Sequence, residues 1–592
     1  MSEQAIRWSN ARVGSARLLA FRVVCAGSTL VTVYVAAALA RAPHASWVTA
    51  GIGVPAAIIA ALLPRTAPPT FLSCSPVLHD CAAARPRVLL PVAGLLALLL
   101  LLPVLLTKLP AFDDYANHLA RIFVIMQHGS NPLLDRFYDV RWHVVPNLVL
   151  DLAAPLAAVT GLYAAGKLLV ISYTLLLLAG PHALHLALYR RWSFGPLLAV
   201  PLVYGTISKW GALNYELALG VALFATAAWI AAREAPALLR GLLSLACVAL
   251  LFICHLLTVA LYGLAIASFE LWRTCAMPAA ARPRAGDALA LILPFAALVP
   301  LMLLSPGADM PTVPWQWGDV HTRLDALRYV VEGYFPTLDL VALLAIIAGL
   351  IWAIAAHAVR LPAFAWYFLA FCGFLFLLSP ATGIGPWEVV GRLPDGVAFF
   401  VIGMLAWDLD SPRRRGAFLA VVVALSLFRM SGVAVAFRSY DRIRADFERS
   451  LPRIAPGSRI LIADDYANQP EDMAPLKELA CLAMIERSSM VSMAYANPYK
   501  QILAVRPRYL ASAGPYNDDP IPLPLLLHPE AHEPAYPLVA FDPTQRIYWA
   551  HWIQDYDYVY VMNRAGQSSP DPRHLELLFD GDRFQLFGVR HS

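Results

Sequence analysis

Long apolar runs recur along most of this chain, and they constrain its fold more than any other feature. Thirteen of them approach the length of about twenty residues that a helix needs to cross a bilayer. A helix satisfies its own backbone hydrogen bonds in lipid, so it is the expected spanning structure. We therefore predict a polytopic α-helical membrane protein. The predicted spans are 18–40, 47–64, 88–107, 164–188, 193–208, 213–232, 240–257, 258–272, 287–305, 338–358, 362–380, 393–408 and 416–436.

The first apolar run has some features of a signal peptide, because three arginines precede it and Ala38-Leu39-Ala40 ends it. Its apolar stretch is longer than the usual 7–15 residues, and further spans follow, so we interpret it as an uncleaved anchor. Basic and acidic residues number 45 and 40, a balance that gives no indication of a nucleic-acid partner. The distribution of these charges is more informative than their sum.

Two segments leave the number of crossings open. Residues 147–160 are apolar but short and carry Asp151, whereas 240–272 form either one long helix or two that meet near His255. If the first does not cross and the second crosses twice, every arginine cluster between the spans falls on one side. By the positive-inside rule that side is the cytoplasm.

This topology places the N-terminus in the cytoplasm. The outer face then holds 108–163, 306–337, 381–392 and the chain after about 438. The abundance of Ala, Arg and Pro is typical of bacterial chains, so we expect the bacterial inner membrane, with the C-terminal region in the periplasm.

The composition changes after the last span. From Arg438 the chain is charged and rich in proline, and its 155 residues are enough for a core of their own. Alternating patterns predict a soluble α/β domain. The expected units are 1–87 (two membrane helices), 88–437 (the membrane core) and 438–592. In the last, strands are predicted at 459–463, 490–494, 558–562 and 583–589, helices at 474–485 and 572–579, and an extended loop at 506–545.

The most informative polar segment lies in the first outer loop. A proline and two aspartates precede an apolar pattern with helical period, which predicts a helix that lies along the membrane surface. Asp114, Asn117, His118 and Arg121 share one face of it. Such a face offers a general base beside phosphate-binding groups. Alternatively, the helix is only amphipathic, and its aspartate caps the N-terminus and pairs with Arg121.

The same segment carries a family resemblance. Asp114-Tyr-Ala-Asn-His-Leu-Ala-Arg121 resembles the DYPNHLAR-like first loop of bacterial multispan type-C glycosyltransferases, with Ala116 in place of proline. Lys209–Leu217 is similar to a GFLNFLLG-like element of these proteins, with Glu216 at a usually apolar position. The resemblance covers about 88–592. It implies a polyprenyl-phosphate-linked sugar donor, a glycan or lipid acceptor, and Asp114 as catalytic base with Asp113 as its neighbour.

The expected reaction needs a base for the acceptor hydroxyl group and cations for the departing phosphate. Retention of configuration would need a second carboxylate nearby, and Asp113 would point about 100° away from Asp114 around a helix. We therefore expect inversion through Asp114. No cofactor is indicated by a motif, but a divalent metal stays possible because Asp113 and Glu216 could converge.

Further candidates lie at the predicted outer ends of spans, where phosphate or sugar can reach them. Arg392 either holds the lipid phosphate or anchors its span at the interface, and His255 either binds substrate or makes an interhelical hydrogen bond. The aromatic loop 306–337 is either a sugar platform or part of the interfacial belt. The substrate-binding candidates are His118, Arg121, Lys209, Asn214, Glu216, His255 and Arg392.

Two other classes of function fit these residues less well. A transporter or lipid flippase usually carries ionisable residues near the bilayer midplane, whereas here they gather at span ends on one face. A scaffold or receptor with an outer sensor domain does not account for the first-loop residues. The repeated pentapeptide Asp464–Asn468 lacks the His-Leu-Ala-Arg continuation, so we interpret it as a strand-end turn. An outward-facing enzyme is favoured.

Overall fold

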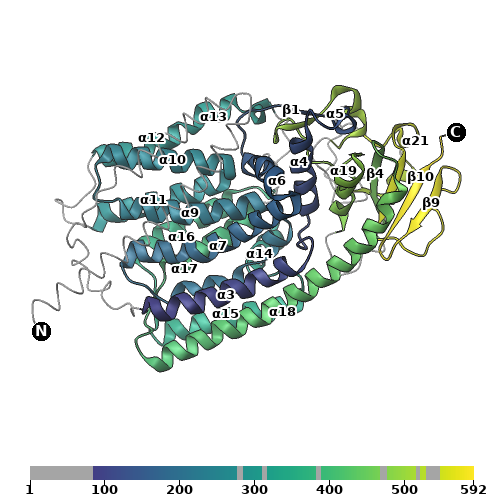
Figure 1. Cartoon of the computed structure of the whole chain (residues 1–592). Coiled ribbons are helices and arrows are strands. Elements are labelled where there is room, and N and C mark those ends of the chain that lie inside the picture. Colours follow the sequence, from purple (N-terminus) through teal and green to yellow (C-terminus); the bar gives the residue numbers. More distant parts are fainter. Residues whose placement is uncertain are drawn as a thin grey trace, which may run out of the picture.

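The computed structural model describes residues 84–276, 285–309, 317–381, 389–466, 476–514, 520–528 and 547–591. The predicted spans 18–40 and 47–64 lie outside these residues. Within them, eight helices are long and apolar enough to cross a membrane. This confirms a polytopic helical membrane protein. Figure 1 shows these helices as one bundle, with a sheet-containing domain at the C-terminal end.

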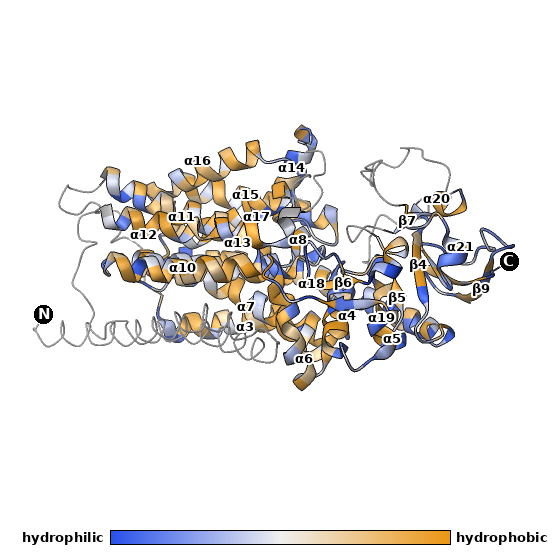
Figure 2. Ribbon diagram, turned by 90° about the horizontal axis from the view of Figure 1, so that it is seen from above, coloured by the Kyte–Doolittle hydropathy of each residue, from blue (hydrophilic) through white to orange (hydrophobic). Residues whose placement is uncertain are grey.

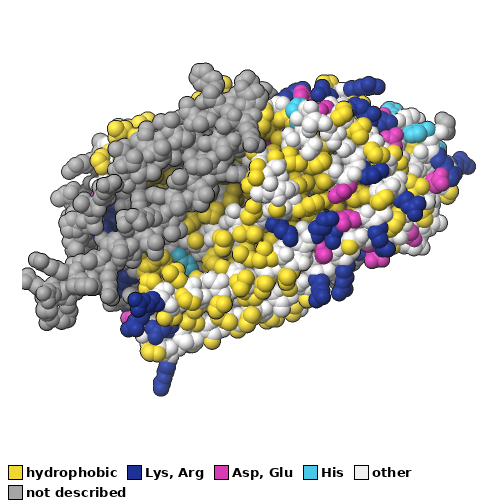
Figure 3. Space-filling model, viewed as in Figure 1, with side chains coloured by type: hydrophobic (Ala, Val, Ile, Leu, Met, Phe, Trp, Pro, Cys, Tyr) yellow, Lys and Arg dark blue, Asp and Glu magenta, His cyan; other side chains and the backbone are white. Residues whose placement is uncertain are grey.

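The bundle helices agree closely with the predicted spans. They are predominantly apolar along their length (Figure 2), and hydrophobic side chains cover the side formed by α3 and α18 (Figure 3). The bundle comprises α3 (Pro86–Leu106), α7 (Leu162–Tyr189), α9 (Leu213–Ala231), α10 (Ala237–Cys254), α11 (Leu256–Ala276), α12 (Ala285–Ala296), α13 (Leu298–Leu304), α15 (Pro336–Ala355), α16 (Ala363–Leu378), α17 (Val389–Met404) and α18 (Pro412–Ser450).

Both ambiguous segments have the structure that the charge distribution favoured. Residues 240–272 form two helices that are separated at His255, whose φ of −167° and ψ of 127° interrupt the helix. Residues 148–160 form a short 3-10 helix, η2 (Leu148–Ala153), and α6 (Ala154–Thr160), which together are too short for a span. Gly161, with φ of 89°, separates α6 from α7.

The predicted helical span 193–208 is wrong in conformation. The chain forms the 3-10 helix η3 (Gly195–Leu202) and the short α8 (Thr206–Lys209). Pro201, inside η3, lacks the N–H group that a continuous α-helix requires. The segment still runs alongside α3, since Trp192 bonds Ala84 before α3 and Lys209 bonds Asp113 beyond it. Such backbone is tolerated at membrane depth when protein surrounds it, as the burial of η3 shows.

The last helix, α18, is longer than its predicted span 416–436. Its 39 residues extend past the bundle into the C-terminal domain (Figure 1). That domain contains a six-stranded sheet with the order β5-β4-β8-β10-β9 and with β7 beside β4. The strands are β4 (Arg459–Asp464), β5 (Met490–Val491), β7 (Ile521–Pro522), β8 (Tyr558–Met562), β9 (Leu575–Asp580) and β10 (Phe584–Val589).

Strand β4 is parallel to β5, β7 and β8, which confirms a mixed α/β domain. The predicted helix 474–485 corresponds to η8 (Lys477–Cys481) and α19 (Leu482–Arg487), and the predicted loop holds η9 (Pro507–Ser512) and α20 (Leu523–Leu527). The predicted helix 572–579 is wrong, because β9 there forms a hairpin with β10. The Asp580-Gly581 turn is the hairpin signal that the prediction overlooked.

The loop 108–163, predicted to lie on the outer face, is joined to the C-terminal domain. Its strand β1 (Tyr138–Val140) pairs antiparallel with β6 (Leu503–Val505) of that domain. A second small pair, β2 (Val359–Arg360) with β3 (Ala406–Trp407), lies at the opposite end of the bundle, between α15 and α18 in the chain. The two ends of the bundle are therefore structurally distinct.

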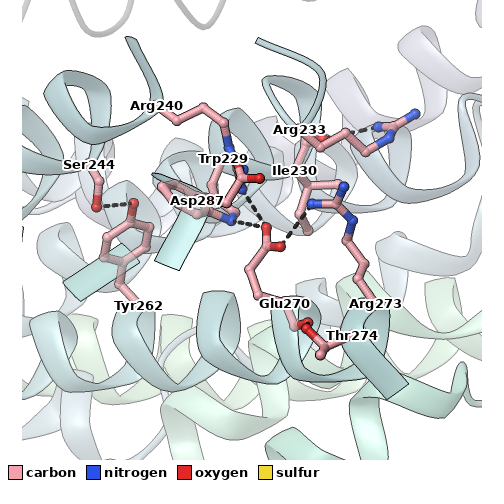
Figure 4. A network of polar contacts seen from close by, with 10 residues as sticks. All are labelled: Trp229, Ile230, Arg233, Arg240, Ser244, Tyr262, Glu270, Arg273, Thr274 and Asp287. Atoms are coloured by element: carbon pink, nitrogen blue, oxygen red, sulfur yellow. Dashed lines mark hydrogen bonds and ion pairs between the residues drawn. The ribbon is translucent and has the colours of Figure 1, made fainter. Parts of the chain in front are cut away.

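A buried ion network fastens four helices at the end remote from the C-terminal domain (Figure 4). Glu270 of α11 accepts hydrogen bonds from Trp229 of α9 (2.9 Å), Arg273 (2.8 Å) and Arg240. Arg240 of α10 also pairs with Asp287 of α12 at 2.6 Å. Buried charges are tolerated when partners surround them in this way, so we assign the network a structural role.

Candidate active site

The predicted first-loop helix is α4 (Tyr115–Gln127), which lies between the end of the bundle and the C-terminal domain (Figure 1). The helix prediction is confirmed. Instead of lying open on the membrane surface, however, α4 is enclosed: Asn117 is 0% exposed and Arg121 is 2% exposed. Asp114 occupies the N-cap position, but within the described structure its side chain does not cap the helix. The capping alternative therefore does not account for this carboxylate.

Both aspartates rest on a turn between α8 and α9. The backbone amide of Asp113 donates to Lys209 (2.8 Å), and that of Asp114 donates to Trp210 (3.1 Å). Gly211 completes the turn with φ of 84°, a left-handed conformation that favours glycine. The two elements that carried the family resemblance are thus in direct contact.

Tyr334 lies beside this pair of segments. The Lys209 ammonium group is 5.9 Å from the centre of its ring, and the Asp113 carboxylate acts on it electrostatically. Its hydroxyl group donates to the carbonyl of Ala111 (2.7 Å). Tyr334 belongs to the predicted aromatic loop 306–337, whose Trp315 lies outside the described residues.

All four residues of the predicted polar face converge on Tyr495, in the C-terminal domain. Its hydroxyl group interacts electrostatically with the Asp114 carboxylate, and its backbone amide donates to the Asn117 side-chain oxygen (2.9 Å). Its ring centre lies 5.2 Å from that of His118 and 6.0 Å from the Arg121 guanidinium carbon. Sequence reasoning missed Tyr495, because no local pattern links residue 495 to the first loop.

His118 and Arg121 have partners that fit a structural role. The imidazole lies near the backbone of Gly211, and burial together with the Arg121 charge lowers the pKa of His118 well below its ordinary value. Arg121 pairs with the buried Asp151 at 2.5 Å, not with Asp114 as the alternative interpretation expected. Burial raises the pKa of Asp151, although Arg121 opposes this effect. Arg121 therefore stabilises the fold of the loop 108–163 through this ion pair.

A second polar group lies inside the bundle. Glu216 of α9 accepts a hydrogen bond from Ser208 (2.6 Å) and interacts electrostatically with Arg392 and Asp395 of α17. Tyr215 joins these elements, since its hydroxyl group donates to the Arg392 carbonyl (2.6 Å). Asp395 was not among the predicted site residues, because its only signal is an acidic residue within an apolar run.

The remaining two candidates, His255 and Asn214, have different neighbours. The ring of His255 lies 5.3 Å from that of Tyr215, so it belongs to the group inside the bundle. Asn214 instead bonds the side chain of Asn147 from the first outer loop. The structure thus brings Asp113, Asp114, His118, Arg121 and Lys209 together around α4, and Glu216, His255 and Arg392 together inside the bundle.

Asp113 and Glu216 lie against different neighbours. Across the described parts of the chain, no cluster of three or more His, Cys, Asp and Glu side chains is arranged to hold a metal ion. The repeated pentapeptide is also explained locally, since Asp464 accepts from Asn563 (2.9 Å) and Asp465 pairs with Arg564 (3.0 Å) at the end of β4.

A small cavity of about 10 Å³ opens between α15 and α18, beside the site rather than beneath α4. Arg429 lines it and pairs with Asp339 at 2.6 Å. Tyr334 borders both the cavity and the Lys209 side of the site. Arg429 was also missed, although a lone arginine within an apolar helix is a recognisable signal. The other lining residues are Tyr204, Gly333, Phe335, Leu338, Phe428, Gly432 and Val433.

Comparison with known proteins gives one structural similarity. No family model matches the chain, and no curated protein matches it. The chain is similar to the crystal structure of ArnT from Cupriavidus metallidurans bound to undecaprenyl phosphate. The two are 12% identical, with a TM-score of 0.48, and the match covers 86% of this chain and 99% of the other.

Proposed function

We propose that this chain is a membrane glycosyltransferase that moves a sugar from a polyprenyl-phosphate donor to an acceptor hydroxyl group. The observation that carries the proposal is the setting of Asp114. Its carboxylate stands at the end of an apolar bundle, between the Lys209–Gly211 turn and Tyr495. The first-loop resemblance supplies the reaction class, and this setting supplies a base where a lipid-linked substrate can reach it.

In the proposed reaction, Asp114 accepts the proton of the acceptor hydroxyl group. The acceptor oxygen bonds to the anomeric carbon, and the bond from that carbon to the phosphate oxygen breaks, so that polyprenyl phosphate leaves with the electron pair. This single displacement inverts the configuration. Asp114 suits the role because it is partly exposed and does not cap α4.

The donor needs cations for its phosphate and an apolar surface for its tail. The backbone of Lys209 bonds that of Asp113, so we assign the Lys209 ammonium group to the donor phosphate. We assign Arg392 to the same task from inside the bundle, with Asn214, Glu216 and His255 as groups for the sugar. The lipid-facing surfaces of α15 and α18, on either side of the Arg429 cavity, suit the tail.

The test is transfer by purified protein in proteoliposomes, with a radiolabelled polyprenyl-phosphate sugar. Asp114→Asn is expected to lower the rate by about 10²–10⁴-fold, because a positioned base typically contributes that much. Asp139→Asn is the matched control, since Asp139 lies in the same loop and pairs on the surface with Arg141. Wild-type rates from Asp114→Asn would remove the proposed base. Donor movement across the bilayer without sugar release would support a flippase or transporter instead.

A further inference from the structure

We infer that the C-terminal domain completes the candidate active site and that Tyr495 positions the Asp114 carboxylate. This inference rests on the proposed function, in which Asp114 is the base. It gives the domain a direct part in the reaction, beyond supporting the outer loops.

The contacts of Tyr495 separate its hydroxyl group from its ring. The ring packs edge-on against His118, at an interplanar angle of 61°, and faces the Arg121 guanidinium group. The hydroxyl group instead interacts electrostatically with the Asp114 carboxylate. Packing alone would require only the ring, so the hydroxyl group is the part that acts on the proposed base.

Asn117 fixes the Tyr495 segment onto α4. Its amide nitrogen donates to Glu478 (2.6 Å) and to the carbonyl of Met493 (2.9 Å), and its amide oxygen accepts from the Tyr495 backbone (2.9 Å). Glu478 and Met493 both belong to the C-terminal domain. Asn117 therefore sets the position of Tyr495 relative to Asp114, which lies one helical turn earlier on the same face.

The chemistry of the phenol suits this role. Burial, followed by the negative charges of Asp114 and Glu478, raises the pKa of Tyr495 well above its ordinary value. The group therefore stays protonated and can only donate to Asp114. Such donation favours the ionised form of a carboxylate.

Other charged groups around Asp114 act in both directions. Glu478 and the Cys481 thiol lie in the same enclosure, and Cys481 donates to Glu478 at 3.6 Å. The charges of Glu478 and of the adjacent Asp113 favour protonation of Asp114. Lys209 on the neighbouring turn opposes them, whereas the buried His118 is neutral. Tyr495 is the group from the C-terminal domain whose hydroxyl favours the ionised carboxylate.

The test compares Tyr495→Phe with Tyr509→Phe. The first keeps the ring contacts and removes the hydroxyl group near Asp114. The second removes a hydroxyl group from another ring of the C-terminal domain, which packs on Phe137 of the first loop. We expect Tyr495→Phe to lower kcat about tenfold, with an unchanged donor KM, and to move the acidic limb of the kcat/KM profile up by about one pH unit. Tyr509→Phe and the unfolding temperatures of both variants should match the wild type.

A second readout does not depend on activity. Carbodiimide labels protonated carboxyl groups, and mass spectrometry of the peptide with Asp114 gives its titration midpoint. That midpoint should rise by about one pH unit in Tyr495→Phe. An unchanged midpoint and pH profile would overturn the inference, even if Asp114→Asn is inactive. If Asp114→Asn transfers sugar at the wild-type rate, the proposed base is wrong, and the inferred role of Tyr495 in catalysis falls with it whatever the midpoint shows.

Discussion

Gly211 lies directly against the backbone of Asp114. A Cβ atom at Gly211 would come within 2.8 Å of the Asp114 nitrogen, and the φ of Gly211 is 84°. The close approach allows Asp114 to bond the carbonyl of Trp210, so the turn and α4 are held together by backbone contacts. The position of the proposed base therefore requires that residue 211 has no side chain.

Gly211→Ala is expected to lower both stability and transfer. The left-handed conformation costs a residue with a Cβ atom about 1–2 kcal/mol, and the contact with Asp114 must also be relieved by a shift of α4. Gly129→Ala is the matched control, because Gly129 has φ of 80° in the same loop but no atom within 4 Å of an added Cβ. The unfolding temperature and the transfer rate should both fall further in Gly211→Ala than in Gly129→Ala. Equal effects in the two variants would show that the contact is unimportant.

The sequence predicted the first-loop helix and its polar face because both depend on local periodicity. A spacing of three and four residues fixes which side chains share a face of α4. It cannot show what lies opposite that face. Tyr495 and Glu478 reach α4 only because the C-terminal domain folds back over the bundle end, a contact between segments that are distant in the chain.

The errors have equally physical causes. The span 193–208 was predicted from its apolar composition, yet Pro201 interrupts a regular α-helix there. The periodicity of 572–579 is typical of a helix, but these residues form β9, whose backbone pairs with that of β10. Composition thus predicted that these segments would be buried, but not their backbone conformation.

The buried imidazole of His118 predicts a dependence of stability on pH. Its folded-state pKa is lowered, so below about pH 6.5 the unfolded chain gains a proton that the folded chain does not bind. Stability should therefore fall as pH decreases from about 6.5, by at most about 1.4 kcal/mol per pH unit from this group. His118→Gln should reduce that slope between pH 6.5 and 5, measured by thermal unfolding in detergent. His321→Gln, at an exposed residue, should leave it unchanged; a wild-type slope in His118→Gln would contradict the prediction.

The ion network in Figure 4 predicts a large loss of stability without a direct effect on the site. Glu270→Gln leaves the buried Arg240 and Arg273 with less compensation, and breaking a buried ion pair typically costs about 3–5 kcal/mol. Asp408→Asn removes a carboxylate from a pair with Arg414 in which both side chains are about 40% exposed, so it should cost less than about 1 kcal/mol. Chemical unfolding in detergent compares the two. Similar losses would show that the buried network is not a fastening point.

The orientation of the protein is predicted to place the C-terminal domain and α4 on the outer face. Lys and Arg side chains gather where α18 begins, at the end remote from that domain (Figure 3), and arginines near helix ends favour the cytoplasmic side. Arg590→Cys and Arg414→Cys replace exposed residues at the two ends, in a chain whose native cysteines are changed to serine. In right-side-out vesicles, a membrane-impermeant maleimide should label Arg590→Cys at once and Arg414→Cys only after permeabilisation. The reverse pattern would invert the topology and place the proposed base on the cytoplasmic side.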